Sequence, residues 1–362
     1  MNKRVGIVGS AGIPARYGGF ETLAENLVLE LAGDFRFIVY CSSVGCSNKM
    51  PRYNNADLIY IPIKANGRSS ILYDAISIIS SLWRVDTLIV LGVGGAFLFP
   101  IIRLLTSRQI ITNIDGLEWK RQKWGFFAKA YLRLQERIAV KFSHKIVADN
   151  EAIVQYLKSK YSKNSHYIPY GGDHVKASGL RKHTKEKYRI NDSGYCFSVC
   201  RIEPENNIHI ILNAFSKVGD VQIIFVGNWN ASKYGRSMYS RYSKFENITL
   251  LDPIYDQITL DELRCNCMLY VHGHSAGGTN PSLVEAMNLG LPIAAWNVSY
   301  NRYSTEGSAL YFDSPLALQQ LLLEVVKSKI DLDSYSRNLL EIAKKKYLWR
   351  TVATGYKGLI NS

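Results

Sequence analysis

The segment MLYVHGHSAGGTNPSLVEAMNLGLPIAAW, residues 268–296, carries the clearest signal for the fold class. It contains a strand, a glycine-rich corner, a helix and a second strand, with the regular elements predicted over 268–272, 281–289 and 291–296. Asn280 suits the N-cap of this helix, Pro281 suits its first position, and Gly290 ends it. Two short strands joined by a helix run parallel, so the segment predicts an α/β protein with a parallel sheet.

The same alternation of buried strands and helices continues on both sides of this segment. Further strands are predicted over 4–9, 36–41, 58–63, 87–91, 109–113, 145–148, 167–170, 194–200, 221–227, 248–251 and 309–312. Further helices are predicted over 20–32, 70–83, 151–160, 207–217, 259–264, 315–327 and 332–346. The polar segment 176–189 is predicted to be a linker or an exposed turn. We expect two Rossmann-like doubly wound parallel-sheet lobes that face each other across a cleft, residues 1–172 and 173–345, with a helix over 346–362 packing back on the first lobe.

Length and composition restrict the possible classes of protein. The 362 residues, 47% hydrophobic and 20% charged, predict a globular protein of two domains rather than a disordered chain. The most apolar stretch, 86–105, is interrupted by glycines, a proline and an arginine, so we expect no membrane span. The first residues predict a buried strand rather than a signal peptide. The net charge of +14 favours a polyanionic partner: nucleic acid, an anionic membrane surface or a phosphorylated substrate.

The cysteines and neighbouring histidines are weak metal candidates. Six cysteines occur without the Cys-x-x-Cys spacing of a zinc site, which favours reduced thiols in a cytosolic protein. His272 and His274 follow Cys265 and Cys267 closely in the sequence, but strand-end histidines that line a cleft are the simpler interpretation. We therefore expect no metal and no cofactor.

The glycine-rich corner of the opening segment is a candidate anion site. Gly277 and Gly278 let a ligand approach the backbone, and the N–H groups around Ser282 with the Thr279 hydroxyl can bind a diphosphate. Glu285 lies one helical turn further and can accept a hydrogen bond from a sugar hydroxyl. A well-capped helix with one exposed glutamate is the alternative, and it leaves the paired glycines unexplained.

A similar corner follows the first predicted strand, at GSAGIPARYGGFE, residues 9–21. Gly18 and Gly19 free the backbone at a helix start, and Arg16 can neutralise an anion. A nicotinamide dinucleotide site would require an acidic residue after the second strand, where residues 40–43 read YCSS. The sequence therefore argues against a dehydrogenase.

Two further segments place charged side chains directly after predicted strands. In CRIEPENNI, residues 200–208, Arg201 can neutralise a leaving phosphate, and an exposed ion pair with a nearby glutamate is the alternative. In NIDGLEWKRQKW, residues 113–124, Asp115 can orient or deprotonate an acceptor hydroxyl. Glu118 could take the same role, and either acid could instead cap the next helix.

A basic stripe follows that segment. Basic residues recur every four positions, at Lys129, Arg133, Arg137, Lys141 and Lys145. Aromatic side chains gather at its start, among them Trp124, Phe126 and Phe127. This pattern is typical of an interfacial amphipathic helix, which anionic phospholipid attracts by about 1 kcal/mol per basic residue. A solvated face on a helix that packs on its lobe is the alternative.

Together these segments resemble the GT-B glycosyltransferases of family 4, and within it the bacterial rhamnosyltransferase-like group that builds capsule, O-antigen and rhamnan polysaccharides. The resemblance spans residues 5–345 and is carried by GIPARYGGFETLAENL, NIDGLEWKRQKW, CRIEPENNI and HGHSAGGTNPSLVEAM. It implies transfer of a sugar, with retention, from a nucleotide diphosphate donor held mainly by the second lobe to an acceptor held by the first.

With the patterns above, the resemblance leads us to expect the following site residues. The catalytic residues are Asp115, Arg201 and Glu285. The donor-binding residues are Gly18, Gly19, Asn206, Gly227, Ile254, Gly277, Gly278, Thr279, Asn280, Ser282 and Glu285. The acceptor-binding residues are Arg16, Tyr17, Glu21, Glu118, Lys120 and Arg121. The membrane-contacting residues are Trp124, Phe126, Phe127, Lys129, Arg133 and Arg137.

Two departures from the broad family bear on the donor. Family 4 commonly has another glutamate at the position of Gly277, so here Glu285 alone serves the sugar hydroxyls. It commonly has a lysine at the position of Asn206. Both departures are typical of the rhamnosyltransferase-like group, so we expect dTDP-L-rhamnose as donor, with UDP- and GDP-sugars as alternatives. The expected acceptor is a lipid-diphosphate-linked saccharide at the cytoplasmic membrane face, and a basic nucleic-acid-binding protein is the rival class.

Overall fold

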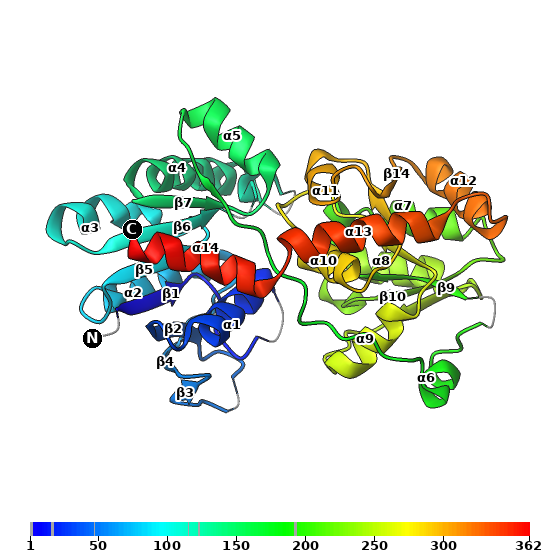
Figure 1. Ribbon diagram of the computed structural model, residues 1–362, viewed down its shortest axis with the longest axis horizontal. Helices are drawn as coiled ribbons and strands as arrows, with labels where there is room; N and C mark the ends of the chain where they lie inside the picture. Colours follow the sequence, from blue (N-terminus) through cyan, green and yellow to red (C-terminus); the bar gives the residue numbers. More distant parts are fainter. Residues whose placement is uncertain (1–2, 16–17, 47, 115, 122–123, 192–193) are drawn as a thin grey trace. The chain divides into compact units, whose positions relative to one another are not determined.

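A computed structural model describes residues 3–15, 18–46, 48–114, 116–121, 124–191 and 194–362. The chain divides into two compact units, which are described separately (Figure 1). Unit 1 comprises Met1–Gly171 and Trp349–Ser362, and unit 2 comprises Gly172–Leu348. None of the described helices is long and apolar enough to cross a membrane.

Unit 1 is built on a largely parallel sheet. Its described strands lie in the order β3-β4-β2-β1-β5-β6-β7-β8, and the short β3 pairs antiparallel with β4. The strands are β1 Arg4–Val8, β2 Arg36–Ser42, β3 Arg52–Tyr53, β4 Ala56–Ile61, β5 Thr87–Leu91, β6 Gln109–Ile114, β7 Lys145–Ala148 and β8 His166–Tyr167. The chain runs outward from β1 to β4 and then returns to β5 on the other side of β1. The strand order therefore reverses between β1 and β5, where open α/β sheets bind ligands.

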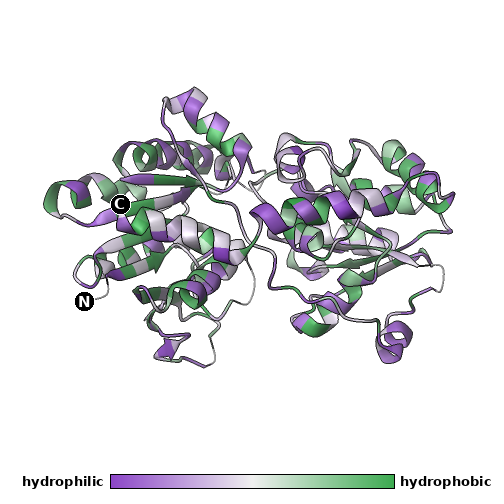
Figure 2. Cartoon of the chain, viewed as in Figure 1, coloured by the Kyte–Doolittle hydropathy of each residue, from purple (hydrophilic) through white to green (hydrophobic). Residues whose placement is uncertain are grey.

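Helices cover both faces of this sheet. They are α1 Gly19–Leu31, α2 Ser70–Ser81, α3 Phe99–Leu105, α4 Phe126–Phe142, α5 Glu151–Tyr161 and α14 Trp349–Asn361. On one face, Tyr73 of α2, Phe99 of α3 and Ala139 of α4 share a core cluster with the sheet. The C-terminal helix α14 packs beside α1, and Asn113 Nδ2 of β6 donates to Tyr356 Oη of α14 at 2.8 Å. Much of α3 is apolar (Figure 2).

Unit 2 has a second parallel sheet, in the order β11-β10-β9-β12-β13-β14 among the described residues. Its strands are β9 Tyr195–Val199, β10 Gln222–Val226, β11 Ile248–Leu251, β12 Leu269–His272, β13 Ile293–Trp296 and β14 Leu310–Phe312. Its helices are α6 Lys182–Lys187, α7 Ile208–Phe215, α8 Lys233–Tyr242, α9 Gln257–Cys265, α10 Pro281–Asn288, α11 Ser299–Ser304, α12 Pro315–Val326 and α13 Leu332–Lys346. Here the strand order reverses between β9 and β12, so this sheet has a ligand-binding edge of the same kind.

The polar segment predicted as a linker contains the helix α6. The residues that precede α6 bind to α9. Arg181 Nη2 lies 2.8 Å from Glu262 Oε2, and Lys176 N donates to Asp261 Oδ2 at 3.1 Å. Thr184 is buried and donates to Glu262 at 2.9 Å. Order in this segment comes from carboxylates of another helix rather than from an apolar face, so hydrophobic periodicity does not reveal it.

Candidate functional site

The loops that follow β9 and β12 meet at the strand-order reversal of unit 2. Ser275 donates to Glu205 O through both its backbone N, at 2.9 Å, and its Oγ, at 2.7 Å. Asn207 Nδ2 donates to Gly273 O at 2.9 Å. A Cβ on Gly273 would lie 2.2 Å from Asn206 O, so glycine permits this close approach. The two loops therefore form one polar corner, the β9/β12 corner.

Arg201 projects from this corner as a free cation. The residue is exposed, and its guanidinium makes no hydrogen bond or ion pair with any residue that the structure describes. Its carbonyl oxygen accepts from Asn206 Nδ2 at 2.7 Å and from Glu203 N at 2.9 Å. The backbone of Arg201 is thus fixed while its charge remains available to an anion.

The helix α10 starts at the same corner without a side-chain cap. Asn280 has extended backbone at the N-cap, but its side chain accepts no hydrogen bond from the described first turn. By contrast, Asn150 caps α5 and Ser314 caps α12. Gly277 has φ of +124°, which a residue with a side chain rarely adopts. The start of α10 therefore has no capping side chain of its own. Pro281 lacks an N–H and Leu283 N donates to Asn280 O at 3.0 Å, so Ser282 N is the first-turn donor that can bind an anion such as a diphosphate.

Glu285 on α10 lies between an arginine and a histidine of unit 2. Its Oε2 lies 2.8 Å from Arg264 Nη2, and its Oε1 lies 3.4 Å from His174 Nε2. Burial by itself would raise the pKa of Glu285, but the charge of Arg264 and the hydrogen bond from His174 outweigh it and lower this pKa to about 2. The carboxylate is 13% exposed. Glu285 is therefore ionised. Arg264 fixes its Oε2, whereas Oε1 faces His174, the more distant partner.

Neither partner of Glu285 was predicted from the sequence. Arg264 is buried in the last turn of α9, where it also lies 3.5 Å from Asp261. A basic residue in a last helical turn usually faces solvent near the helix carbonyls, so the pattern gave no signal for a buried ion pair. His174 lies just after the boundary between the two units, where the sequence contains no motif that indicates a functional residue.

The remaining predicted donor residues lie at several places in the chain. Asn206 and Thr279 are buried in the two loops of the β9/β12 corner, together with Gly278. Gly227 follows β10, the neighbour of β9, and Ile254 is partly buried after β11. Ser282 and Asn280 lie at the start of α10. Gly18 and Gly19 belong to unit 1, at the start of α1.

The corner between β1 and α1 in unit 1 already holds carboxylates of the chain. Ala11 N donates to Glu21 Oε1 at 2.6 Å, and Ala15 N donates to Glu25 Oε2 at 2.7 Å. Glu21 lies in the first turn of α1, where its negative charge occupies the positive end of the helix. The predicted residues Arg16, Tyr17 and Asp115 lie outside the described residues. This corner is therefore lined by the protein's own anions.

The predicted acceptor residues after β6 are mutually bound. Glu118 pairs with Arg121 at 2.7 Å and accepts from Trp124 Nε1 at 3.0 Å. The ammonium of Lys120 lies 5.7 Å from the ring centroid of Trp119. These contacts fix Glu118, and they also hold Trp124 partly buried rather than free on the surface.

Asp74 of α2 is a further acidic residue that the sequence did not single out. Its carboxylate adjoins the turn after β5, because a Cβ on Gly94 would lie 2.5 Å from Asp74 Oδ2. Burial raises the pKa of Asp74 to about 8, so the group is largely protonated at neutral pH. It lies beside the strand-order reversal of unit 1, the edge at which such sheets bind ligands.

The paired histidines at the end of β12 stack on each other. The rings of His272 and His274 lie 4.4 Å apart at 11°, and burial lowers the pKa of His272 to about 3. His272 is therefore a neutral side chain in the core at physiological pH. Among the described residues, no group of three or more histidine, cysteine or acidic side chains is arranged to hold a metal ion.

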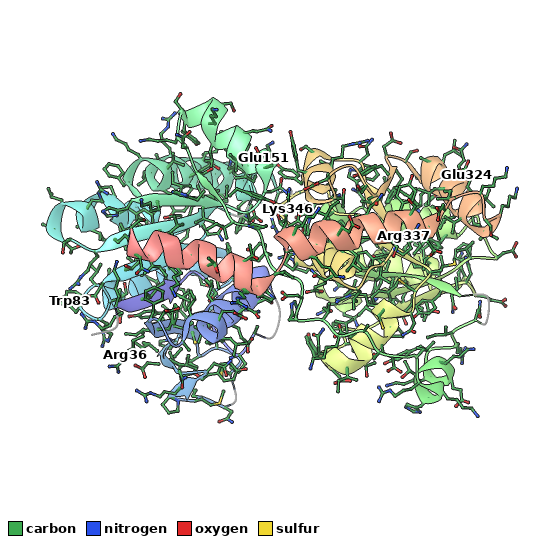
Figure 3. The ribbon with its side chains drawn as sticks, viewed as in Figure 1. Arg36, Trp83, Glu151, Glu324, Arg337 and Lys346 are labelled. Carbon is green, nitrogen blue, oxygen red and sulfur yellow. The ribbon has the colours of Figure 1, made fainter. Side chains whose placement is uncertain are left out.

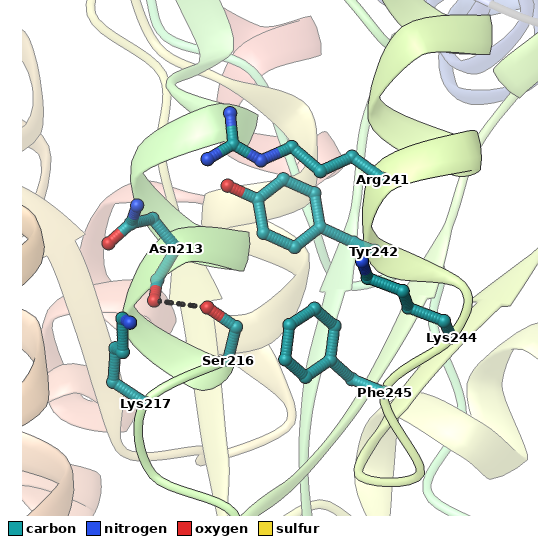
Figure 4. A pocket seen from close by; sticks show the side chains of 7 residues that line it. All are labelled: Asn213, Ser216, Lys217, Arg241, Tyr242, Lys244 and Phe245. Carbon is teal, nitrogen blue, oxygen red and sulfur yellow. Dashed lines mark hydrogen bonds between the residues drawn. The ribbon is translucent and has the colours of Figure 1, made fainter.

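A separate hollow of about 250 Å³ lies between the ends of α7 and α8 (Figure 4). Lys217, Arg241 and Lys244 lie along it, and Tyr242 and Phe245 supply aromatic surface. These helix ends lead into β10 and β11, so the hollow lies at the amino edge of the sheet. It is distinct from the β9/β12 corner, which lies at the carboxyl edge.

Comparison with known proteins agrees with this architecture. Two families match: a domain of unknown function (DUF1972) over residues 2–173, and glycosyl transferases group 1 over residues 181–338. Protein CapJ of Staphylococcus aureus is 24% identical over 245 residues, which cover 62% of this chain. The alignment spans 60% of CapJ, less than two thirds of that protein.

Solved structures resemble the whole chain. Sucrose-phosphate synthase from Thermosynechococcus elongatus has a TM-score of 0.83 at 14% identity, covering 99% of this chain and 98% of its own. HepE from Anabaena, in complex with UDP-glucose, has a TM-score of 0.76 at 12% identity and covers 100% of both chains. A glycosyltransferase from Rickettsia africae has a TM-score of 0.72 at 13% identity, covering 99% of this chain and 97% of its own. These likenesses establish the GT-B fold, and residues 181–338 match the glycosyl transferases group 1 family.

Proposed function

We propose that this enzyme transfers L-rhamnose, with retention, from dTDP-L-rhamnose to a lipid-diphosphate-linked saccharide during synthesis of a bacterial surface polysaccharide such as O-antigen or capsule. The observation that carries the proposal is the β9/β12 corner. It combines the free Arg201, the uncapped start of α10 and the fixed carboxylate of Glu285 at one edge of one sheet. These groups are what a nucleotide diphosphate sugar requires: two stabilise the diphosphate, and the third accepts from a hydroxyl.

The proposed chemistry is substitution on the face from which the diphosphate leaves. The bond between sugar C1 and the diphosphate oxygen breaks, the acceptor oxygen bonds to C1 from the same face, and the acceptor proton passes to the departing diphosphate. Arg201 and Ser282 N at the start of α10 stabilise the charge that develops on the diphosphate. Asp115 orients the acceptor hydroxyl. This arrangement requires no metal, since the arginine and the helix start supply the positive charge.

The choice of donor follows from Glu285 and Asn206. Glu285 has Oε2 bound to Arg264 at 2.8 Å and only the more distant His174 at Oε1, so we place the hydroxyl of the donor at Oε1, in competition with His174. A deoxythymidine donor offers a single ribose hydroxyl at this position, so one glutamate suffices. Asn206 is neutral and donates to the backbone, which leaves Arg201 as the main counter-charge of the corner. UDP-hexoses are the alternative donors, since HepE was solved with UDP-glucose.

We further propose that unit 1 binds the acceptor and associates peripherally with the cytoplasmic face of the membrane. Phe126 and Phe127 at the start of α4 are 80% and 86% exposed, which supports contact with lipid. Lys129, Arg133 and Arg137 would meet anionic head groups, although Arg133 also lies 4.3 Å from the Trp119 ring centroid. Changing these three residues to glutamate should release the protein from anionic liposomes, and unchanged sedimentation would rule out the stripe.

The decisive experiment is a donor screen. Purified protein is incubated with a synthetic lipid-diphosphate N-acetylglucosamine acceptor and dTDP-rhamnose, UDP-glucose, UDP-galactose or GDP-mannose in parallel. We expect product from dTDP-rhamnose, and NMR of this product should show the anomeric configuration of the donor. Product from a UDP- or GDP-sugar alone would refute the rhamnose assignment, and no product from any donor would refute the proposed reaction. Filter binding to duplex DNA across a salt series tests the nucleic-acid alternative.

A further inference from the structure

The helix α2 of unit 1 exposes apolar side chains on the side that faces away from the sheet. Leu72, Ile76 and Ile79 are exposed on the helix, and Trp83, in the turn that follows it, is 72% exposed. Successive spacings of four, three and four residues place these side chains on one side of a helix. Tyr73 and Ile78 on the opposite side are fully buried, so α2 is apolar both toward the core and toward solvent.

The neighbouring helix α3 repeats this arrangement. Phe99 and Ile102 are buried in the core that α2, α3 and α4 share. On the outer side, Leu104 is 83% exposed and Leu105 is 72% exposed, and Ile101 lies beside them. A surface helix normally carries polar residues on this side. Exposed large apolar residues on two neighbouring helices indicate an interaction surface rather than scattered surface residues.

The charges next to this surface are mainly positive, and the carboxylate of Asp86, which follows Arg84 closely, is paired with Arg4 and Arg108. Arg84 follows Trp83, Arg103 lies in the last turn of α3, and both are exposed. Among the described residues of α2, α3 and α4, the acids are Asp74 and Glu136. Asp74 lies on the side of α2 that faces Gly94, and Glu136 is buried and bonded to Trp119 Nε1 at 2.9 Å. The outer side of these helices therefore presents apolar groups and cations without a carboxylate.

A helix of unit 2 provides the contrast. On α12, Leu316, Leu323 and Val326 are also exposed, but Glu324 lies among them. Exposed apolar residues thus occur in both units, but on α2 and α3 they combine with exposed arginines, whereas on α12 they surround a glutamate. This combination matches an anionic lipid surface, which attracts cations and accepts apolar side chains. It does not suit a second copy of the same surface, because the cations would repel each other.

We propose that the outer side of α2 and α3, with Trp83, inserts into the interface of an anionic phospholipid bilayer. Leu104, Leu105 and Trp83 enter the acyl boundary, and Arg84 and Arg103 bind lipid phosphates. Trp83 projects at the outer edge of unit 1, as Figure 3 shows. The inference deepens the proposed function, because it names the surface by which the enzyme reaches a lipid-linked acceptor. It extends the membrane contact beyond the aromatic start of α4.

The test measures binding of the full-length protein to vesicles of phosphatidylglycerol and phosphatidylcholine in equal parts. Co-sedimentation of the triple variant Trp83→Gln, Leu104→Gln, Leu105→Gln is compared with that of a matched control in unit 2, Leu316→Gln, Leu323→Gln, Val326→Gln. We expect at least a tenfold weaker affinity for the first variant and wild-type affinity for the control. Circular dichroism and thermal melting verify that both variants fold, since all six side chains are exposed.

Equal affinity of the first variant and the wild type would overturn the proposal, as would equal losses in both variants. Binding to pure phosphatidylcholine vesicles as tight as to the mixed vesicles would overturn the anionic part. A concentration-dependent dimer that the first variant abolishes, seen by analytical ultracentrifugation without lipid, would assign the surface to a second copy instead. Turnover of a soluble short-chain acceptor should be unchanged in the variant, so a failure of the proposed reaction and a failure of the lipid surface are distinguishable.

Discussion

The corner between β1 and α1 in unit 1 and the corner between β12 and α10 in unit 2 both lie where the strand order of a parallel sheet reverses. In unit 1 the N–H groups of the loop donate to Glu21 and Glu25, so the protein's own carboxylates fill the positions that an anion would take. In unit 2 the two loops of the β9/β12 corner bind each other through backbone carbonyl oxygens, and the guanidinium of Arg201 remains free beside the uncapped start of α10. Two sheets of the same topology therefore offer opposite electrostatics, and the side chains decide which of them accepts a diphosphate.

The largest effect is expected from Glu285→Ala. This change leaves the buried Arg264 without its carboxylate partner at 2.8 Å, and breaking one side of a buried ion pair costs about 3–5 kcal/mol of unfolding free energy. Urea denaturation measures the loss. Glu285→Gln keeps an acceptor oxygen and should cost less, so it is the better variant for testing turnover. A Glu285→Ala protein as stable as the wild type would show that the carboxylate does not compensate Arg264.

The next largest effect is expected from Arg201→Ala, which should change catalysis but not stability. Arg201→Ala should lower kcat by about 100- to 1000-fold, the usual result of removing one group that stabilises developing charge. The unfolding free energy should stay nearly unchanged, because the guanidinium makes no hydrogen bond or ion pair with a described residue. Arg337→Ala on α13, also exposed, is the matched control and should keep full activity (Figure 3). Full activity of Arg201→Ala would show that the free guanidinium of the β9/β12 corner does not contribute to catalysis.

The sequence predicted the parts of this fold that depend on local pattern. The parallel strands, the glycine corner before α10 and the position of Arg201 follow from alternation, caps and strand ends, which are encoded within short windows. The helix α8 escaped prediction because its sequence KYGRSMYSRY has few apolar residues and buries mainly Met238 and Tyr242. The small edge strand β3 is two residues long, too short for a period to appear.

The partners of the predicted site residues could not be read from the sequence. Arg264 and Glu285 are joined only by packing between α9 and α10, and nothing in either segment names the other. The same holds for Ala11 and Glu21, where an ordinary first-turn glutamate turns out to bind the loop of its own corner. Sequence patterns locate candidate groups, whereas the charge state and freedom of each group depend on contacts between distant segments.

A smaller effect is expected from Glu21→Gln in unit 1. The amide oxygen can still accept from Ala11 N, so this bond loses its charge-assisted part, about 1 kcal/mol. Urea denaturation of this variant beside Glu285→Ala compares the glutamates of the two corners directly. A loss as large as that of Glu285→Ala would mean that the unit 1 carboxylate is also held as one half of a buried ion pair.

The smallest effect is a pH dependence at the contact between His174 and Glu285. Burial lowers the pKa of His174, but the hydrogen bond and charge of Glu285 outweigh it, so this pKa is raised above its ordinary value of 6.5. Arg264, which lowers the pKa, and Asp261, which raises it, also face the ring. Glu285 stays ionised over the whole range because its own pKa is about 2.

A histidine whose pKa is higher in the folded state than in the unfolded state stabilises the folded protein. This contribution is complete at pH values below the unfolded-state pKa, and it disappears as the pH rises through the folded-state pKa. The unfolding free energy of the wild type should therefore exceed that of His174→Gln by about 1 kcal/mol near pH 6 and by much less near pH 9. His183→Gln on α6, where the histidine is exposed, should show no such difference. A difference of the same size at pH 6 and pH 9 would mean that the imidazole binds Glu285 as a neutral donor, and Oε1 would then be equally occupied at every pH at which a sugar hydroxyl must compete for it.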